Sequence, residues 1–283
     1  TMTLSNVGKQ KRLDRLFYKG RTLIVPVDDS LIFGPKDGLL NLSQTIESIA
    51  TSNVDAILGF KKDYDYLINY NIRTPFIFNL TASTILNEHT KKVMIASVEN
   101  ALIAGADCVA AHINFSSAFE NDMIKNFSVI ANECDRLGMP LLAIAYPRKE
   151  INGVDYNYED IKINDVKAYS ELIAHCTRVV CELGADIIKT YYTGDSSSFR
   201  KVIDAACGKP VIIAGGPKVS VRESLNFAAG ALAAGGAGIS FGRNVFNRSH
   251  IKNYLDSLSK LVHNGSTVDE AYEIYSKSLE ALS

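Results

Sequence analysis

GADIIKTYYTGD (residues 184–195) reads as a glycine turn, a short apolar strand and a Gly-Asp turn, with Lys189 near the end of the strand. Lysine is almost never fully buried unless it is paired with a carboxylate or used in chemistry. The position of this strand in the fold therefore decides which explanation applies to Lys189.

Similar phrases precede three other apolar runs: NVDAI at 53–57, GADCV at 105–109 and GGAGI at 235–239. In three of the four phrases a glycine follows a helical pattern, at the point where a helix commonly ends in a left-handed residue. Helix, glycine and strand thus repeat along the chain.

Eight apolar runs are expected to form strands, at residues 22–28, 54–60, 75–80, 107–113, 140–146, 186–192, 210–214 and 237–241. Continuous apolar runs are typical of parallel strands that are buried on both faces. Helical periodicity fills the intervals, most clearly over 165–183. This alternation predicts an α/β fold, a single (β/α)8 TIM barrel domain spanning 1–283, with an N-terminal helix and extra C-terminal helices within 249–281. Leu13, Leu16 and Phe17 form the expected inner face of the N-terminal helix.

The composition argues against several functional classes. The 283 residues carry a formal net charge of −1, which gives no electrostatic footprint for nucleic acid or an anionic membrane. No apolar run approaches a membrane span, and the N-terminus lacks the apolar middle of a signal peptide. The five cysteines include no CxxC pair, so we expect mostly buried, reduced thiols in a cytoplasmic protein. The histidines show no HxH or HExxH spacing, which predicts no dedicated metal site.

Polar residues gather where the predicted strands end, and in a TIM barrel these ends carry the chemistry. They are Asp28, Asp29, Lys61, Asn79, Thr81, His112, Asn114, Tyr146, Arg148, Lys189 and Tyr191. We expect these side chains to line or rim one cavity. The polar segment 148–164 is long for a connection of this kind, which indicates a functional loop or a lid.

Lys189 is the central candidate. An amine is nucleophilic only when it is neutral, and burial in an apolar barrel disfavours the ammonium form. A neutral amine can attack a ketone to form a Schiff base, which weakens an adjacent C–C bond. Asp28 is the candidate proton relay and Tyr146 the candidate acid–base phenol. The alternative is a structural lysine that pairs with Asp28 or Asp29.

A phosphate site is the second chemical prediction. The loops after strands 7 and 8 of a TIM barrel often bind phosphate, and here they read AGGPK (214–218) and FGRN (241–244). Gly215 and Gly216 allow close backbone approach, and Lys218 and Arg243 add positive charge. The alternative is that the glycines serve only the turns.

The blocks VPVDD, MPLLAIAYPR, GADIIKTYYTGD, IAGGPK and GRNVF together resemble the archaeal-type class I aldolases over nearly the whole chain. The resemblance implies Lys189 as the Schiff-base lysine, Tyr146 as the acid–base tyrosine, Asp28 as the strand-1 aspartate, and phosphate binding by Gly215, Gly216, Gly242 and Arg243. It also implies no metal or other cofactor, a small phosphorylated substrate, and a homo-oligomer, with decamers among the relatives. GKQKRLDRLF (8–17) most resembles the heptulosonate synthases and the aminohydroxybenzoate-pathway aldolases, which join aspartate semialdehyde to a ketose phosphate or dihydroxyacetone phosphate.

One departure from the family pattern affects the site. Asp28-Asp29-Ser30 stands where the family usually has Asp-His-Gly. The missing histidine disfavours the family's thiolase activity. If the strand stays regular to its end, alternation turns only one of the two acids toward the cavity. The resemblance implies that this acid is Asp28, which leaves Asp29 at the rim. There Asp29 either binds a cationic part of the substrate or is held by a basic side chain, and His112 is a further substrate-binding candidate.

Other functions remain open from the sequence. Fructose-bisphosphate aldolase is the second candidate, followed by a 3-hydroxy-5-phosphonooxypentane-2,4-dione-type thiolase. A barrel that binds sugar phosphates without catalysis would lack a reason for the three catalytic candidates on separate strands. A metal-dependent class II aldolase would need clustered histidines, and only His112 is well placed.

Overall fold

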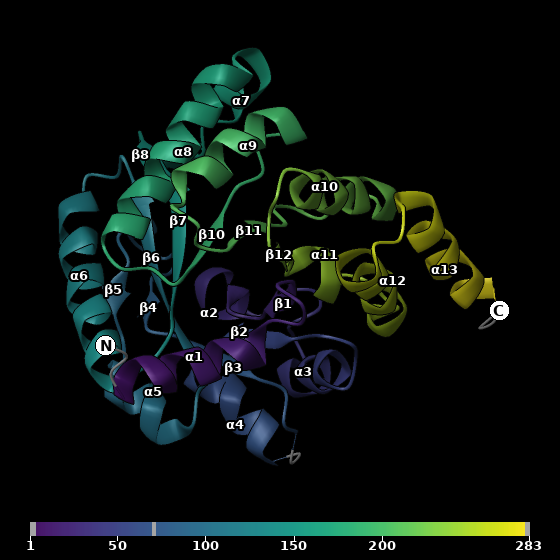
Figure 1. Ribbon diagram of the computed structural model, residues 1–283, viewed down its shortest axis with the longest axis horizontal. Helices are drawn as coiled ribbons and strands as arrows, with labels where there is room; N and C mark the ends of the chain where they lie inside the picture. The colour runs from purple at the N-terminus through teal and green to yellow at the C-terminus, as the bar shows by residue number, and fades with distance from the viewer. Residues whose placement is uncertain (1–3, 70–71, 281–283) are drawn as a thin grey trace.

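The computed structural model describes residues 4–69 and 72–280, and its centre is a closed barrel of parallel strands (Figure 1). The barrel strands are β1 (Thr22–Pro26), β2 (Ala56–Gly59), β3 (Phe76–Asn79), β6 (Cys108–Phe115), β7 (Leu141–Pro147), β10 (Ile187–Thr190), β11 (Val211–Ala214) and β12 (Gly238–Ser240). Their order around the ring is β1-β12-β11-β10-β7-β6-β3-β2. The predicted TIM barrel and all eight predicted strands are confirmed, with ends that differ by up to two residues.

Helices surround the barrel (Figure 1). They are α2 (Asp29–Phe33), α3 (Leu42–Ala50), α4 (Lys61–Asn69), α5 (Val98–Ala104), α6 (Glu120–Leu137), α8 (Val166–Glu182), α9 (Ser196–Ala205), α10 (Val221–Ala233), α11 (Arg243–Phe246), α12 (Ile251–Asn264) and α13 (Val268–Glu280). The predicted helix over 165–183 is α8, and the predicted tail helices are α12 and α13, with residue 281 outside the described residues. The repeated glycines Gly105, Gly184 and Gly235 have φ of +84°, +105° and +99°, which is the left-handed geometry expected at those helix ends.

The apolar residues form two clusters because side chains alternate along each strand. The outer cluster lies between the strands and the helices, and the inner cluster fills the barrel. The N-terminal helix α1 (Leu4–Leu16) packs on the inner cluster. Leu16 is fully buried there, and Leu13 and Phe17 are partly buried against it, as the sequence predicts; residues 1–3 lie outside the described part of the chain.

Two connections on the carboxyl side of the strands carry their own small sheets. The segment after β3 contains the antiparallel pair β4 (Thr81–Ala82) and β5 (Val93–Met94). The polar segment 148–164 forms a hairpin of β8 (Lys149–Ile151) and β9 (Val154–Tyr156), followed by α7 (Glu159–Asn164). The segment predicted to be a long polar loop is therefore a folded element.

The five cysteines are all free thiols. Cys108, Cys134 and Cys176 are buried, as expected, whereas Cys181 is half-buried and Cys207 is exposed. Cys207 is exposed because it lies in a turn, with φ of +52°, rather than on an apolar face. Among the described residues, no helix has the length and apolar character needed to cross a membrane.

The aspartates of three repeated phrases tie neighbouring strands together at the amino end of the barrel. Asp55 accepts a hydrogen bond from the Leu23 N–H at 2.6 Å, Asp107 from the Phe76 N–H at 3.0 Å, and Asp186 from the Leu141 N–H at 3.0 Å. Helix α1 supplies cations to two of them, since Arg15 lies 2.6 Å from Asp107 and Lys9 lies 3.0 Å from Asp186. In these three phrases the aspartate precedes its own strand, and its side chain accepts a hydrogen bond from a backbone N–H of the neighbouring strand.

Replacing Asp186 tests this arrangement. We expect Asp186→Ala to lower the free energy of unfolding by about 2–3 kcal/mol, because the Leu141 N–H is left buried without an acceptor. Asp135→Ala is the matched control, because Asp135 also pairs with Lys9, at 2.6 Å, but its side chain is 69% exposed; it should cost less than about 1 kcal/mol. Urea denaturation of both variants measures the difference, and equal losses would show that the N–H contact of Asp186 adds nothing.

Candidate active site

A cavity of about 90 Å³ lies at the carboxyl end of the barrel. Of the predicted site residues, Asp28, Asp29, His112, Tyr146, Lys189, Gly215, Gly216, Gly242 and Arg243 all line it. It opens into a groove of about 630 Å³ that reaches the β8–β9 hairpin and α7. The convergence expected from the strand ends is therefore present in the structure.

Lys218 is the exception among the predicted site residues. Its ammonium donates a hydrogen bond to the carbonyl of Asn247 at 2.6 Å, and the residue lines neither the cavity nor the groove. Lys61, at the exposed start of α4, also lies outside the cavity. Both residues come soon after a barrel strand in the sequence, but neither side chain lies in the cavity.

Lys189 points into the barrel from β10 and is 6% exposed. Its neighbours in register are Ile144 on β7 and Ile212 on β11, which are both apolar. Burial lowers the pKa of Lys189, and the carboxylates of Asp28 and Asp29 oppose that shift. The arrangement can supply an amine that is neutral more often than an ordinary lysine, as nucleophilic chemistry requires.

The adjacent acids, Asp28 and Asp29, lie in different surroundings. Asp28 continues the inward-facing side of β1, is 8% exposed, and accepts a hydrogen bond from the Asn79 amide at 3.0 Å. Asp29 begins α2 and forms an ion pair with Arg243 at 3.4 Å. Burial raises the pKa of Asp29, with a smaller contribution from Asp28. Of the two alternatives for Asp29, the structure shows the one in which a basic side chain holds it.

Tyr146 is buried between two rings. Tyr191 stacks on it with centroids 4.1 Å apart and planes 10° apart, and His112 meets it edge-on at 5.0 Å. Burial raises the pKa of the Tyr146 phenol well above its ordinary value, so it keeps its proton at neutral pH. Burial also lowers the pKa of His112, which is therefore a neutral imidazole. Its Nε2 is buried and has no hydrogen-bond partner among the described residues, which leaves one polar atom for a ligand.

The glycine loops after β11 and β12 are held in a defined shape. The Asn244 amide donates to the carbonyls of Gly215 at 2.9 Å and Pro217 at 3.1 Å. A Cβ on Gly215 would lie 2.9 Å from the Phe241 ring, and Gly216 has φ of +63°. Glycine is thus required for space at the first position and favoured by conformation at the second. This open backbone beside Arg243 can accept an anionic group.

Three further residues support the site from the strand ends. Thr81 accepts a hydrogen bond from the His112 N–H at 3.0 Å, and the Asn114 amide donates to the Thr90 carbonyl at 2.9 Å. Asn79 holds Asp28, as described above. None of the three lines the cavity or the groove, contrary to the expectation from their strand-end positions; Asn79 and Thr81 instead hold Asp28 and His112, which do line the cavity.

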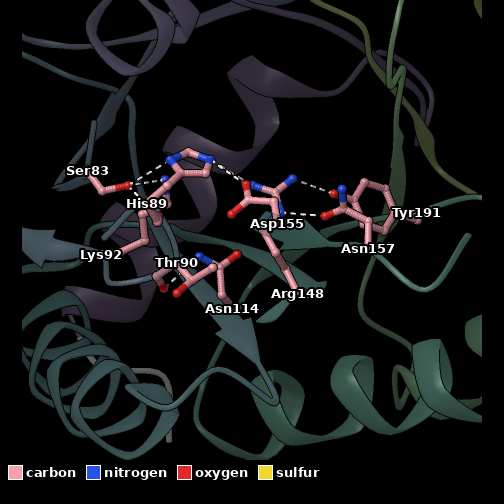
Figure 2. Close-up of polar contacts among 9 residues, drawn as sticks. All are labelled: Ser83, His89, Thr90, Lys92, Asn114, Arg148, Asp155, Asn157 and Tyr191. Carbon is pink, nitrogen blue, oxygen red and sulfur yellow. Dashed lines mark hydrogen bonds and ion pairs between the residues drawn. The ribbon is translucent and has the colours of Figure 1, made fainter. Parts of the chain in front are cut away.

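His89 and Lys92 also line the cavity, although neither is among the site residues predicted from the sequence. They lie between β4 and β5, in the segment NEHTKK (87–92), which has the composition of an ordinary solvated loop. Figure 2 shows His89 beside Arg148, whose Nη1 lies 3.3 Å from Nε2 of His89, and Lys92 on the Ser83 side of His89. Burial, then the charges of Lys92 and Arg148, lower the pKa of His89 to about 3. No local sequence signal distinguishes these two residues from other polar loop residues.

In the described part of the chain, no three His, Cys, Asp or Glu side chains gather in a way that could hold a metal ion.

Residues 22–248 match the family model described as DeoC/LacD family aldolase. A 2-amino-3,7-dideoxy-D-threo-hept-6-ulosonate synthase of Halobacterium salinarum is 36% identical over 269 residues, covering 95% of this chain and 96% of the relative. A 2-amino-4,5-dihydroxy-6-oxo-7-(phosphonooxy)heptanoate synthase of Streptomyces griseus is 35% identical over 265 residues, covering 92% of each.

Solved structures of archaeal fructose 1,6-bisphosphate aldolases share the fold. One has a TM-score of 0.79 at 27% identity and covers 91% of this chain and 100% of its own. Another, with a TM-score of 0.77 at 27% identity over 90% of this chain and 99% of its own, is described with its catalytic lysine covalently bound to the carbinolamine intermediate of the substrate.

The lowered pKa of Lys189 can be measured directly. The rate at which acetic anhydride labels Lys189, followed by mass spectrometry across a pH series, should have a midpoint below the ordinary lysine value of about 10.4. Asp28→Asn should move the midpoint lower still, because the Asp28 carboxylate favours the charged ammonium. Lys62, which is 68% exposed, gives the reactivity reference within each sample. A midpoint at or above the ordinary value would contradict the effect of burial.

Proposed function

The chain belongs to the DeoC/LacD aldolase family and is a Schiff-base-forming, class I aldolase, and we propose that it joins a phosphorylated ketone to an amino-aldehyde, with Lys189 as the nucleophile. The observation that carries the proposal is the buried Lys189 at the end of β10, in one cavity with Asp28, Tyr146 and the glycine loops. These groups supply the amine, the proton-transfer side chains and the anion-binding backbone that a class I reaction uses.

The proposed substrates follow from the chemistry named for the relatives. The Streptomyces griseus relative makes, by its name, a heptanoate with a 2-amino group, a 6-oxo group, hydroxyls at carbons 4 and 5 and a 7-phosphonooxy group. An aldol bond joins the carbon next to a ketone to the carbon that bears the new hydroxyl, which here is the bond between carbons 5 and 4. Breaking it gives dihydroxyacetone phosphate and aspartate semialdehyde. We propose this pair, or a ketose phosphate in place of the three-carbon ketone, for the present chain.

Lys189 would attack the ketone carbon with its neutral amine and form a carbinolamine. Loss of water gives an iminium ion, and loss of a proton from the adjacent carbon gives an enamine that attacks the aldehyde. Hydrolysis of the product iminium then restores the free lysine. Burial serves the first step, because it increases the fraction of neutral amine.

Tyr146 and Asp28 would handle the protons. The Tyr146 phenol keeps its proton at neutral pH and can donate it to an oxygen that develops negative charge. Asp28, held by Asn79, can accept and return a proton at the carbinolamine hydroxyl. The edge-on contact with His112 and the stacked Tyr191 keep the Tyr146 ring in place.

The phosphate of the ketone would bind at Gly215, Gly216, Gly242 and Arg243. Arg243 is 41% exposed at its side chain and keeps Asp29 close to the cavity. That contact sets the position of the guanidinium and leaves N–H donors for an anion, since arginine has five. Lys218 is left out of this site because its ammonium is engaged elsewhere.

Fructose-bisphosphate aldolase is the second candidate, because archaeal enzymes of that name share the fold with TM-scores near 0.8. The relatives with higher sequence identity are named for products that carry a 2-amino group, and for this reason fructose-bisphosphate aldolase is placed second. We further propose that the protein needs no metal ion, is cytoplasmic and forms a homo-oligomer. The resemblance to the class I aldolases supports the first and third of these properties. Activity that persists in the presence of a chelator would support metal independence.

Borohydride trapping tests the nucleophile. Wild-type protein incubated with dihydroxyacetone phosphate and sodium borohydride should gain a covalent adduct on Lys189, detectable by mass spectrometry. Lys189→Ala removes the amine and Lys189→Arg offers a guanidinium that stays protonated, so both should form no adduct and lose turnover. Circular dichroism verifies that the variants are folded. Substantial turnover in either folded variant, or a non-covalent wild-type complex, would refute the Schiff-base assignment.

Arg243→Ala tests the phosphate end. Loss of a charge-assisted contact of about 1.5–3 kcal/mol should raise the KM for dihydroxyacetone phosphate by roughly 10- to 150-fold. The KM for unphosphorylated dihydroxyacetone should change far less. Lys218→Ala is the matched control and should leave both constants unchanged, because its ammonium lies outside the cavity. Equal effects of Arg243→Ala on both ketones would place the phosphate elsewhere.

A further inference from the structure

Two cationic side chains in the cavity have no part in the steps proposed above: Lys92 and Arg148. Lys92 is 3% exposed and Arg148 is half-buried, and both line the cavity. A buried cation normally pairs with a carboxylate. Among the described residues neither forms such a pair; the Lys92 ammonium instead donates to the Ser83 hydroxyl at 2.7 Å.

The hydrogen bonds of Arg148 also end on neutral groups (Figure 2). Its Nε donates to Asn157 at 2.7 Å, its Nη2 donates to the Tyr191 hydroxyl at 2.8 Å, and its Nη1 lies 3.3 Å from Nε2 of His89. A guanidinium has five N–H donors, of which these contacts use three. The guanidinium is therefore fixed in direction and keeps two donors for a ligand.

A carboxylate lies next to these cations. Asp155, on strand β9 of the hairpin, has Oδ2 at 3.5 Å from Nε2 of His89, and its side chain is 33% exposed in the groove. Because burial and the nearby cations keep His89 neutral at pH 7, this contact is not an ion pair. Asp155 thus offers a negative charge within the same group of residues (Figure 2).

The barrel order places Lys92 opposite the proposed phosphate loops. Those loops follow β11 and β12, whereas Lys92 lies in the connection between β3 and β6, on the opposite side of the ring. Arg148 follows β7, the strand beside β10 that carries Lys189. The reacting lysine therefore lies between two charged ends of one cavity.

We propose that Lys92, Arg148 and Asp155 form a subsite for the α-amino acid group of the aldehyde, in which the two cations bind its carboxylate and Asp155 binds its ammonium. This inference rests on the proposed function, because it assumes that Lys189 activates the ketone. It assigns the choice of aldehyde to residues on two inserted segments, the β4–β5 loop and the β8–β9 hairpin.

The charge pattern favours an amino acid over a second phosphate. A phosphate dianion would meet Lys92 and Arg148 but would also meet the Asp155 carboxylate, and like charges at short range oppose binding. A carboxylate that carries an ammonium on the adjacent carbon matches both signs. Burial and Arg148 lower the pKa of Lys92 to about 7, and a bound carboxylate would favour its charged form.

Three aldehydes separate these possibilities, each assayed with dihydroxyacetone phosphate. Aspartate semialdehyde has the carboxylate and the ammonium, 4-oxobutanoate has the same carbon chain without the ammonium, and glyceraldehyde 3-phosphate carries a phosphate instead. Wild-type protein should have its highest kcat/KM with aspartate semialdehyde. Borohydride trapping with dihydroxyacetone phosphate alone is measured in parallel on every protein, so that the ketone half of the reaction is scored separately.

Asp155→Asn should raise the KM for aspartate semialdehyde by about 10-fold or more and leave the KM for 4-oxobutanoate within about threefold, which abolishes the preference for the amino compound. Lys92→Met should raise the KM for both carboxylate aldehydes by a similar factor. Neither variant should lose the borohydride adduct.

Matched controls come from the same segments. Glu150→Gln neutralises the acid that faces Asp155 across the hairpin, and Lys91→Met removes the cation next to Lys92, which lies over the Phe119 ring at 4.8 Å. Neither residue lines the cavity or the groove, so both variants should keep wild-type constants.

The assay separates failure of this inference from failure of the proposed function. Wild-type protein without any borohydride adduct would refute the proposed function itself. An intact adduct with a preference for glyceraldehyde 3-phosphate, with no turnover of any of the three aldehydes, or with equal effects of Asp155→Asn on amino and non-amino aldehydes, would overturn the subsite and leave the aldolase in place.

Discussion

A closed parallel barrel turns alternate residues of every strand into its interior, and the chemistry of this protein depends on that constraint. Lys189 follows Ile187 on the inward side of β10 and therefore has no exposed position available. The same constraint buries Tyr146 at the end of β7. Burial then acts on both groups in the same sense, since it disfavours the charged form of each. The result is an amine that tends to be neutral beside a phenol that keeps its proton.

Because the mouth of the barrel is poorly solvated, each charge placed there needs a partner. Asp28 accepts a hydrogen bond from the Asn79 amide, and Asp29 forms an ion pair with Arg243. Lys92 and Arg148 are different, since their hydrogen bonds end on hydroxyls, an amide and a neutral imidazole. A cavity with satisfied hydrogen bonds but incompletely balanced charge is suited to a charged ligand, because the ligand completes the balance.

The two ends of the barrel divide stability from chemistry. At the amino end, Asp107 and Asp186 join backbone donors of adjacent strands to cations of α1. At the carboxyl end, the loops and the β8–β9 hairpin add polar groups without contributing strands to the barrel. Changes in these loops can therefore alter the substrate while the barrel is conserved, as is common for this fold.

The sequence by itself determined the barrel, its eight strands and the central residues of the site. Apolar runs and left-handed glycines are local signals, and in a barrel every strand ends at the same mouth, so Lys189, Tyr146 and Asp28 could be brought together without coordinates. Only the tertiary structure separated Lys218 from Arg243, since both lie in basic glycine loops and the direction of each side chain depends on distant contacts. It also placed Lys92 in the cavity and Asp155 in the groove; both come from connections between barrel strands, whose polar composition is the same whether a connection faces solvent or a cavity. Periodicity records which face of a strand is buried, but the path of a loop is set by packing against residues far away in the sequence.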